Sequence, residues 1–465
     1  MKALASVILV FLTATSVLAQ PVTGPDPAPA ARPAPLLSGR MDALAGFYAD
    51  NNQFMGTILV ARGGHILVNK AYGLANIEWK IANTPDTKFR LGSVTKQFTA
   101  AAILILAERG RLSIDDPVKT HMPDAPAAWD KITLRHLLNH TSGIANFTGF
   151  PDFGKTKSIA QTPQELVARF KDRPLEFEPG SRWNYTNSGY VLLGYLIERI
   201  SGVSYEKFVT DNIFTPLGMK DTGCDSNTAL IERRASGYTP RGGGRQNADF
   251  VHMSIPLGGG SLYSTTGDLL RWERGLFGGK LLKPESVTTM TTPVLENYGM
   301  GVFVRSTNGR KQVAHPGGIE GFNAYMMHYP DDGLTVIVLA NLNGPAAEIL
   351  ATKLAAMALN DTGVIIPSER RRVALDAAAL ARYAGRYQVN PNTVAEVTTS
   401  KGRVFLKMGN GPVNEIFHAG KNRFFRATPD GDLEFSGPAD APAAELIRTP
   451  ENGGTPDRAR RVGTE

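Results

Sequence analysis

Three short motifs follow one another along the 465-residue chain, and each carries side chains suited to acyl-transfer chemistry. The first is Ser93-x-x-Lys96, which offers a hydroxyl nucleophile and an amine base. Three residues of helix bring two side chains onto one face, so Lys96 could accept the Ser93 proton if burial lowers the pKa of its amine. The motif predicts attack of an activated serine on a carbonyl carbon.

The second and third motifs could complete such a site. In Tyr185-x-Asn187 the tyrosine could carry a proton to the leaving group, or share the base role if Lys96 depresses its pKa. In an extended segment the asparagine amide would point to the same face as the tyrosine. In His315-Pro-Gly317-Gly318 the histidine could bind substrate, while the glycines allow close approach of a backbone. The backbone N–H groups of Ser93 and Gly318 are the candidate oxyanion hole, which needs two donors.

Each motif alone is a weak signal, because two of them occur twice. Ser204-x-x-Lys207 repeats the first motif and His418-Ala-Gly420 repeats the third. We prefer His315 because predicted strands surround it and a Gly-Gly pair follows. Taken singly, the same residues could be a solvated lysine, a half-buried tyrosine or a turn histidine. The prediction therefore rests on their joint occurrence.

Periodic segments around the motifs indicate the elements that would position them. Apolar spacing predicts helices with glycine stops or a threonine cap, and β-rich runs joined by turns predict antiparallel strands. The predicted helices are 41–49, 93–109, 190–200, 265–272 and 346–359, and the predicted strands are 57–61, 66–68, 312–315, 323–329 and 334–341.

Composition shifts along the chain predict several distinct parts. A positive start, a short apolar run and Val-Leu-Ala19 predict a secretory signal with cleavage after Ala19, and hence a secreted or periplasmic protein. No later segment has the length of a membrane span. The expected parts are a signal peptide at 1–19, a Pro/Ala-rich leader at 20–40, a hydrolase domain at 41–366, a linker at 367–376, a small β accessory domain at 377–450 and a disordered tail at 451–465.

Charge and cysteine content exclude some classes of function. The net charge of +7 comes partly from the Arg370–Arg372 run and from arginines near the C-terminus, without interleaved aromatic residues, so nucleic-acid binding is not expected. Cys224 is the single cysteine, which excludes an internal disulfide, and we expect an inert thiol. The eight histidines are scattered without a zinc motif, so we expect neither a metal ion nor a cofactor.

The order Ser-x-x-Lys, Tyr-x-Asn and His-x-Gly resembles the serine β-lactamase and penicillin-binding superfamily. It is most similar to the class C β-lactamase-related branch, with its D,D-peptidases, D-aminopeptidases and family VIII esterases. The resemblance covers about residues 41–360 and includes the segments Leu137–Gly143, Phe177–Gly180, Pro216–Met219 and Gly259–Leu262. It implies an α/β (α+β) fold: an antiparallel sheet flanked by helices, a mostly helical subdomain and a cleft between them. The small C-terminal all-β domain is similar to accessory domains of some relatives.

The resemblance also implies roles for the motif residues. Ser93 is the acylated nucleophile, Lys96 and Tyr185 form the proton network, and Asn187 contacts the substrate amide. His315 replaces the lysine of the usual Lys-Thr-Gly, with Gly317 as its glycine. That lysine gives β-lactamases a fixed charge near the substrate carboxylate, whereas a histidine is largely neutral at pH 7.

The expected partner is a small-molecule or peptide substrate. We rank peptides containing D-amino acids first, small esters second and β-lactams third. A penicillin-recognising sensor with slow turnover remains an alternative. So does an inactive scaffold, although the intact Ser93, Lys96 and Tyr185 argue against it. The sequence leaves the oligomeric state open.

Overall fold

The computed structural model describes residues 36–465 except 242–243, 362–363, 365, 367–371, 401, 412, 428–429, 439–440, 450–454 and 464–465. The predicted signal peptide and most of the predicted leader lie outside the described residues. The leader prediction is wrong at its end, because helix α1 (Leu37–Asp50) begins before residue 40. Met41, Leu44 and Tyr48 are buried with helical spacing, and the helix extends one turn upstream of this apolar face.

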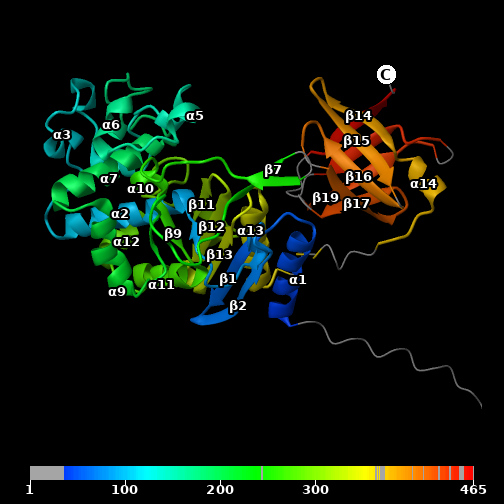
Figure 1. Cartoon of the computed structure of the whole chain (residues 1–465), viewed down its shortest axis with the longest axis horizontal. Coiled ribbons are helices and arrows are strands. Elements are labelled where there is room, and N and C mark those ends of the chain that lie inside the picture. The colour runs from blue at the N-terminus through cyan, green and yellow to red at the C-terminus, as the bar shows by residue number, and fades with distance from the viewer. Residues whose placement is uncertain are drawn as a thin grey trace, which may run out of the picture. The chain divides into compact units, whose positions relative to one another are not determined.

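A six-stranded antiparallel sheet forms the centre of the hydrolase region, in the order β10-β11-β12-β13-β1-β2 (Figure 1). The β1–β2 hairpin and the β11–β13 meander confirm the predicted strands. The bounds are β1 Gly56–Arg62, β2 His65–Tyr72, β10 Phe303–Thr307, β11 Arg310–Ile319, β12 Phe322–Tyr329 and β13 Leu334–Ala340.

Both faces of the sheet are covered, which explains why every residue of β13 is buried. Alternate side chains of a strand point to opposite faces. Val336 and Val338 belong to the core shared with α1 and α13 (Ala346–Ala358), whereas Ile337 and Leu339 belong to the core shared with α11 (Thr266–Phe277) and the helical subdomain. The sheet thus separates two apolar cores.

The remaining elements of this region are short, apart from two long helices that carry site residues. Those two are α2 (Thr95–Glu108) and α7 (Asn187–Ser201), and both helix predictions are confirmed. The other helices are α3 Val118–His121, α4 Leu134–Leu138, α5 Phe153–Thr156, α6 Pro163–Lys171, α8 Tyr205–Val209, α9 Thr215–Leu217, α10 Leu257–Gly260 and α12 Pro284–Met290.

Single turns and small sheets connect these helices. The 3₁₀ turns are η1 Gly92–Val94, η2 Ala127–Trp129, η3 Phe147–Gly149 and η5 Pro330–Asp332, and η4 Thr210–Phe214 is a π-helical turn. The small sheets contain β3 Leu74–Asn76, β4 Ile81–Ala82, β5 Phe89–Arg90, β6 Gly223–Cys224, β7 Tyr238–Arg241, β8 Gly244–Asn247 and β9 Leu262–Ser264.

The C-terminal region is a closed eight-stranded antiparallel barrel, preceded by α14 (Ala377–Ala381). This confirms an all-β region. The tail prediction is wrong for β21, which pairs with both β20 and β14 and closes the barrel. The strands are β14 Gly385–Asn390, β15 Thr393–Ser400, β16 Arg403–Met408, β17 Val413–Gly420, β18 Arg423–Ala427, β19 Asp430–Ser436, β20 Glu445–Thr449 and β21 Asp457–Val462.

The arginines of β21 make its sequence polar, which is why the sequence predicted a tail. Only Ala459 of this strand is buried. Because alternate side chains of a strand point to opposite faces, a mostly polar segment can still form a strand of the barrel. In the part of the chain that the structure describes, none of the helices combines the length and the apolar character that crossing a membrane requires.

Candidate active site

The turn η1 places Ser93 directly before α2, against the glycine segment of β11. Gly92 has a φ of +52°, and a Cβ added there would lie 2.7 Å from the carbonyl oxygen of Gly318. A Cβ on Gly317 would lie 2.0 Å from the carbonyl oxygen of Leu91. Because neither position has room for a side chain, glycine lets the β11 backbone approach the Ser93 turn closely.

Lys96 lies in the first turn of α2 and is fully buried. Its Nζ is 3.1 Å from Ser93 Oγ, 2.9 Å from Asn187 Oδ1 and 2.9 Å from the carbonyl oxygen of Gly259. Burial lowers the pKa of the amine to about 7. A neutral amine can donate to the amide and the carbonyl oxygen, which leaves its lone pair directed at the Ser93 hydroxyl. The geometry therefore suits proton transfer from Ser93 to Lys96.

Tyr185 donates a hydrogen bond from its hydroxyl to Ser93 Oγ over 2.8 Å. Burial raises the pKa of the phenol above its usual 10, which contradicts the alternative in which Lys96 depresses it. Lys96 Nζ lies 4.8 Å from the centre of the Tyr185 ring, over its face. The cost of removing the phenolate from water outweighs any stabilisation by this amine, so the pKa of Tyr185 stays raised. Tyr185 is accordingly a proton donor at neutral pH.

Asn187 is the first residue of α7, so the expectation of an extended Tyr-x-Asn segment is wrong at this residue. Thr186 is extended and precedes the helix, and the turn still directs both side chains toward Ser93 and Lys96. The Asn187 Oδ1 accepts from Lys96, and Nδ2 donates to Thr148 Oγ1 over 3.1 Å. Asn146 Oδ1 accepts from the Asn187 backbone N–H. The amide thus holds the Lys96 amine in place.

His315 is buried and neutral. Burial lowers the pKa of its imidazole to about 3. Nδ1 lies 2.6 Å from the carbonyl oxygen of Pro316 and Nε2 lies 2.9 Å from the Tyr298 hydroxyl. Because a carbonyl only accepts, Nδ1 carries the hydrogen, and Nε2 accepts from the tyrosine. This side chain provides no fixed positive charge.

Two residues around the site escaped sequence reasoning. Tyr298 holds His315, but it comes from a loop with no pattern that could identify it. His140 is fully buried with a φ of +61°, and its Nδ1 accepts from the Thr186 N–H. The centre of its ring lies 4.3 Å from that of Tyr185 and 4.7 Å from that of Tyr298, so His140 packs against both rings. The only signal for His140 was its place in the Leu137–Gly143 segment.

The duplicate motifs have structural roles instead. The Ser204 hydroxyl caps α8 by accepting from the Lys207 N–H, and the Lys207 ammonium pairs with Asp211. In the barrel, the ring nitrogens of His418 lie 3.1 Å from the carbonyl oxygen of Val373 and 2.7 Å from that of Lys421, and the nitrogen that carries the hydrogen donates to its neighbour. The Lys207 amine is therefore not hydrogen-bonded to the Ser204 hydroxyl, and His418 contacts backbone rather than a nucleophile.

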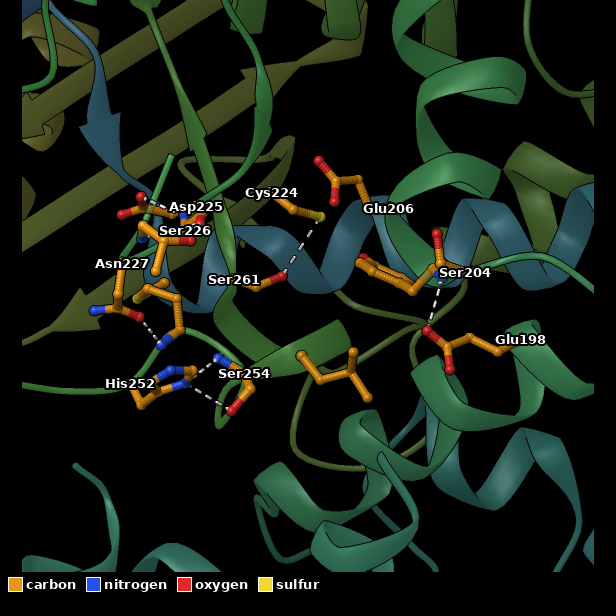
Figure 2. A pocket seen from close by; sticks show the side chains of 14 residues that line it. Glu198, Ser204, Glu206, Cys224, Asp225, Ser226, Asn227, His252, Ser254 and Ser261 are labelled. Atoms are coloured by element: carbon orange, nitrogen blue, oxygen red, sulfur yellow. Dashed lines mark hydrogen bonds between the residues drawn. The ribbon is translucent and has the colours of Figure 1, made fainter. Parts of the chain in front are cut away.

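A cavity of about 310 Å³ lies next to α10, and its lining includes Ser204 of the duplicate motif but none of Ser93, Lys96, Tyr185, Asn187 and His315 (Figure 2). Leu257 and Ser261, at the two ends of α10, line it, whereas Gly259 between them binds Lys96. Cys224 also lines it, and burial raises the pKa of the thiol to about 12. The thiol is therefore protonated at neutral pH and unsuited to be a nucleophile.

The chain is similar to known proteins over most of its length. Residues 41–360 match the family model described as Beta-lactamase. The chain is 31% identical over 425 residues to Penicillin-binding protein 4* of Bacillus subtilis (strain 168), covering 86% of this chain and 93% of the relative.

Two solved structures are also similar. One is the octameric penicillin-binding protein homologue from Pyrococcus abyssi, with a TM-score of 0.65 and 25% identity, covering 90% of this chain and 99% of the homologue. The other is D-amino acid amidase from Ochrobactrum anthropi SV3, with a TM-score of 0.60 and 25% identity, covering 69% and 97%. The chain belongs to the beta-lactamase family.

Proposed function

We propose that this protein is an exported serine hydrolase that cleaves an amide or ester through an acyl-enzyme on Ser93. The observation that carries the proposal is the Lys96 amine, which is buried, has a pKa of about 7 and lies 3.1 Å from Ser93 Oγ. A base whose pKa matches the working pH is effective in proton transfer. The chemistry needs no metal ion or cofactor.

In the proposed mechanism Lys96 takes the Ser93 proton as Oγ attacks the substrate carbonyl carbon. The backbone N–H groups of Ser93 and Gly318 stabilise the oxyanion. Tyr185 donates its proton to the leaving group and regains one from Lys96, so the acyl-enzyme forms with the base neutral again. Water then attacks the ester carbonyl, its proton passes to the same network, and Ser93 is released.

The preferred substrates are peptides or amides of D-amino acids. The neutral His315 favours these substrates over β-lactams, because the side chain at that position provides no fixed positive charge for a substrate carboxylate. A similar structure is a D-amino acid amidase, which points in the same direction. Small esters rank second. The signal-like residues 1–19 support export to the periplasm or medium.

A slow-turnover penicillin-binding protein is the second candidate, because a relative with 31% identity carries that name. The two functions differ in deacylation. A hydrolase releases product at a constant rate, whereas a binding protein gives one equivalent of acylation followed by slow release.

The test compares hydrolysis of D- and L-alanine p-nitroanilide, p-nitrophenyl acetate and a chromogenic cephalosporin by the wild type and Ser93→Ala. We expect turnover of the D-anilide above the L-anilide, weaker turnover of the cephalosporin, and none by the variant. A preference for the L-anilide would contradict the assigned substrate class. A burst without turnover on every compound would favour the binding protein.

A further inference from the structure

We propose that the cavity beside α10 (Figure 2) binds a small molecule with a primary ammonium group at one end and a carbonyl oxygen at the other, as a lysine residue of a peptide has. The proposal goes beyond the proposed function, because it concerns a second site with its own ligand. The cavity volume of about 310 Å³ is near the lower end of the range for sites that hold small molecules.

The cavity and the proposed catalytic site are built from different residues, although both use α10. Leu257 and Ser261, at the two ends of this helix, line the cavity. The carbonyl oxygen of Gly259 between them accepts from Lys96 instead. A molecule enclosed by the cavity lining therefore contacts neither the proposed base nor Ser93.

Carboxylates give the cavity a negative charge. Glu198 of α7, Glu206 of α8 and Asp225 line it, and its described lining includes neither lysine nor arginine. Asp225 is paired with Arg90 and Arg234, which lie outside the lining. The Glu206 carboxylate has no hydrogen-bond or ion-pair partner in the part of the chain that the structure describes. It can therefore accept from an ammonium group without losing an existing contact.

The effect of this charge inside the cavity is visible at Cys224, which is also part of the lining. Burial, followed by the negative charge of Glu206, raises the pKa of the thiol to about 12, and the charges of Asp225 and Glu198 act in the same direction. Surroundings that disfavour a thiolate favour a cation. The ammonium end of the ligand accordingly belongs beside Glu206.

His252 offers a hydrogen-bond donor for the other end of the ligand. Its Nδ1 accepts from the Ser254 backbone N–H over 3.3 Å, so Nε2 carries the ring hydrogen, and Nε2 has no partner among the described residues. Figure 2 shows His252 on the far side of the cavity from Glu206. Leu257 and Met253 add apolar lining that suits an alkyl chain. The negative charge disfavours a carboxylate, which leaves a neutral carbonyl oxygen as the acceptor.

The test is an NMR titration of the full chain with three probes: 6-aminohexanamide, hexanamide, which lacks the ammonium group, and hexylamine, which lacks the carbonyl oxygen. The first should bind most tightly. Glu206→Gln should weaken binding of both amines roughly fivefold, as expected for a partly exposed charge pair, and leave hexanamide unchanged. His252→Phe removes the donor and should weaken binding of both amides but not of hexylamine.

Glu285→Gln is the matched control. Glu285 is an exposed glutamate in the first turn of α12, as Glu206 is in α8, but it does not line the cavity. This variant should bind every probe like the wild type.

Equal affinity of the wild type for 6-aminohexanamide and hexanamide would overturn the proposal, and so would unchanged binding of 6-aminohexanamide by Glu206→Gln. Ser93→Ala should bind the probes like the wild type, so the test does not depend on the serine chemistry. A changed affinity in Ser93→Ala would place the probe at the catalytic site and contradict a second site.

Discussion

At the residue scale, the central feature is a buried amine with no carboxylate among its hydrogen-bond partners. The partners of Lys96 are a hydroxyl, an amide oxygen and a carbonyl oxygen. Neutral acceptors do not compensate for burial of a full charge, so desolvation lowers the pKa to about 7. The folded protein therefore holds a base that is ready at neutral pH.

The first prediction concerns pH. If Lys96 is the base, kcat/KM should rise with pH and level off above about 7, as Lys96 loses its proton. Tyr185 and His315 should add no limb between pH 5 and 9, because their pKa values are raised above 10 and lowered to about 3. A pH–rate profile checks this. An acid limb centred near 5 would point to a carboxylate base and contradict the assignment.

The second prediction concerns Lys96→Met. The rate should fall about 10²–10⁴-fold, as for loss of a general base. The folded pKa of Lys96 lies below the ordinary 10.5, so wild-type folding releases a proton between about pH 7 and 10.5 and stability rises with pH across this window. Below pH 7 Lys96 is charged and buried in the folded wild type, so the full cost of desolvating the ammonium lowers its free energy of unfolding. The variant should therefore unfold at higher denaturant concentration at pH 7, and wild-type turnover in it would refute the role of Lys96.

At the element scale, the contacts at the start of each helix distinguish the proposed catalytic motif from its duplicate. Ser93 precedes α2, and its hydroxyl is hydrogen-bonded to Lys96 and Tyr185. The Ser204 hydroxyl instead caps the N-terminus of α8. The Ser-x-x-Lys pattern alone is compatible with either a catalytic serine or a helix-capping serine. Only the packing of α2 against α7 and α10 places a base beside one serine and not the other.

The third prediction follows from this difference. Ser204→Ala should leave kcat/KM unchanged and lower the free energy of unfolding by about 1 kcal/mol, the usual effect of losing a helix cap. His418→Ala should likewise leave activity unchanged. Steady-state kinetics and urea denaturation on both variants check the prediction. A large loss of activity in either one would mean that the wrong copy of the motif was chosen.

The fourth prediction concerns the packing of α11 on the sheet. Glu273 of α11 is buried near His328 of β12, and burial raises the pKa of the carboxyl to about 8. Wild-type folding therefore takes up a proton between about pH 4.5 and 8, and stability falls with rising pH in that window. Glu273→Gln lacks this dependence.

The gain in stability of Glu273→Gln over the wild type should accordingly grow from pH 4.5 to 8. Denaturation at several pH values measures it. A gain that stays constant with pH would show that Glu273 is charged throughout.

The elements were more predictable than the contacts between them. Apolar spacing predicted the helix around 190–200, but it could not show that Thr186 lets the helix begin at Asn187. Backbone caps decide such boundaries, and they depend on the first turn rather than on periodicity. Tyr298 illustrates the limit, since its contact with His315 joins a loop to a strand, and no local pattern encodes it.

At the scale of the whole molecule, the site joins segments that are distant in the sequence. The motif order, together with the family resemblance, predicted the antiparallel sheet, the helical part and the residues that meet. The C-terminal all-β region was also predicted, but not its closure. Closure depends on pairing of β21 with β14, which are about seventy residues apart, and sequence composition does not report such long-range pairing.

The central claim is that Ser93 alone is the activated nucleophile, and intact-mass spectrometry after treatment with a fluorophosphonate tests it most directly. The wild type and Ser204→Ala should each gain the mass of one phosphonyl group, and Ser93→Ala should gain none. An adduct on Ser93→Ala, or no adduct on the wild type under conditions that label another serine hydrolase, would contradict the account.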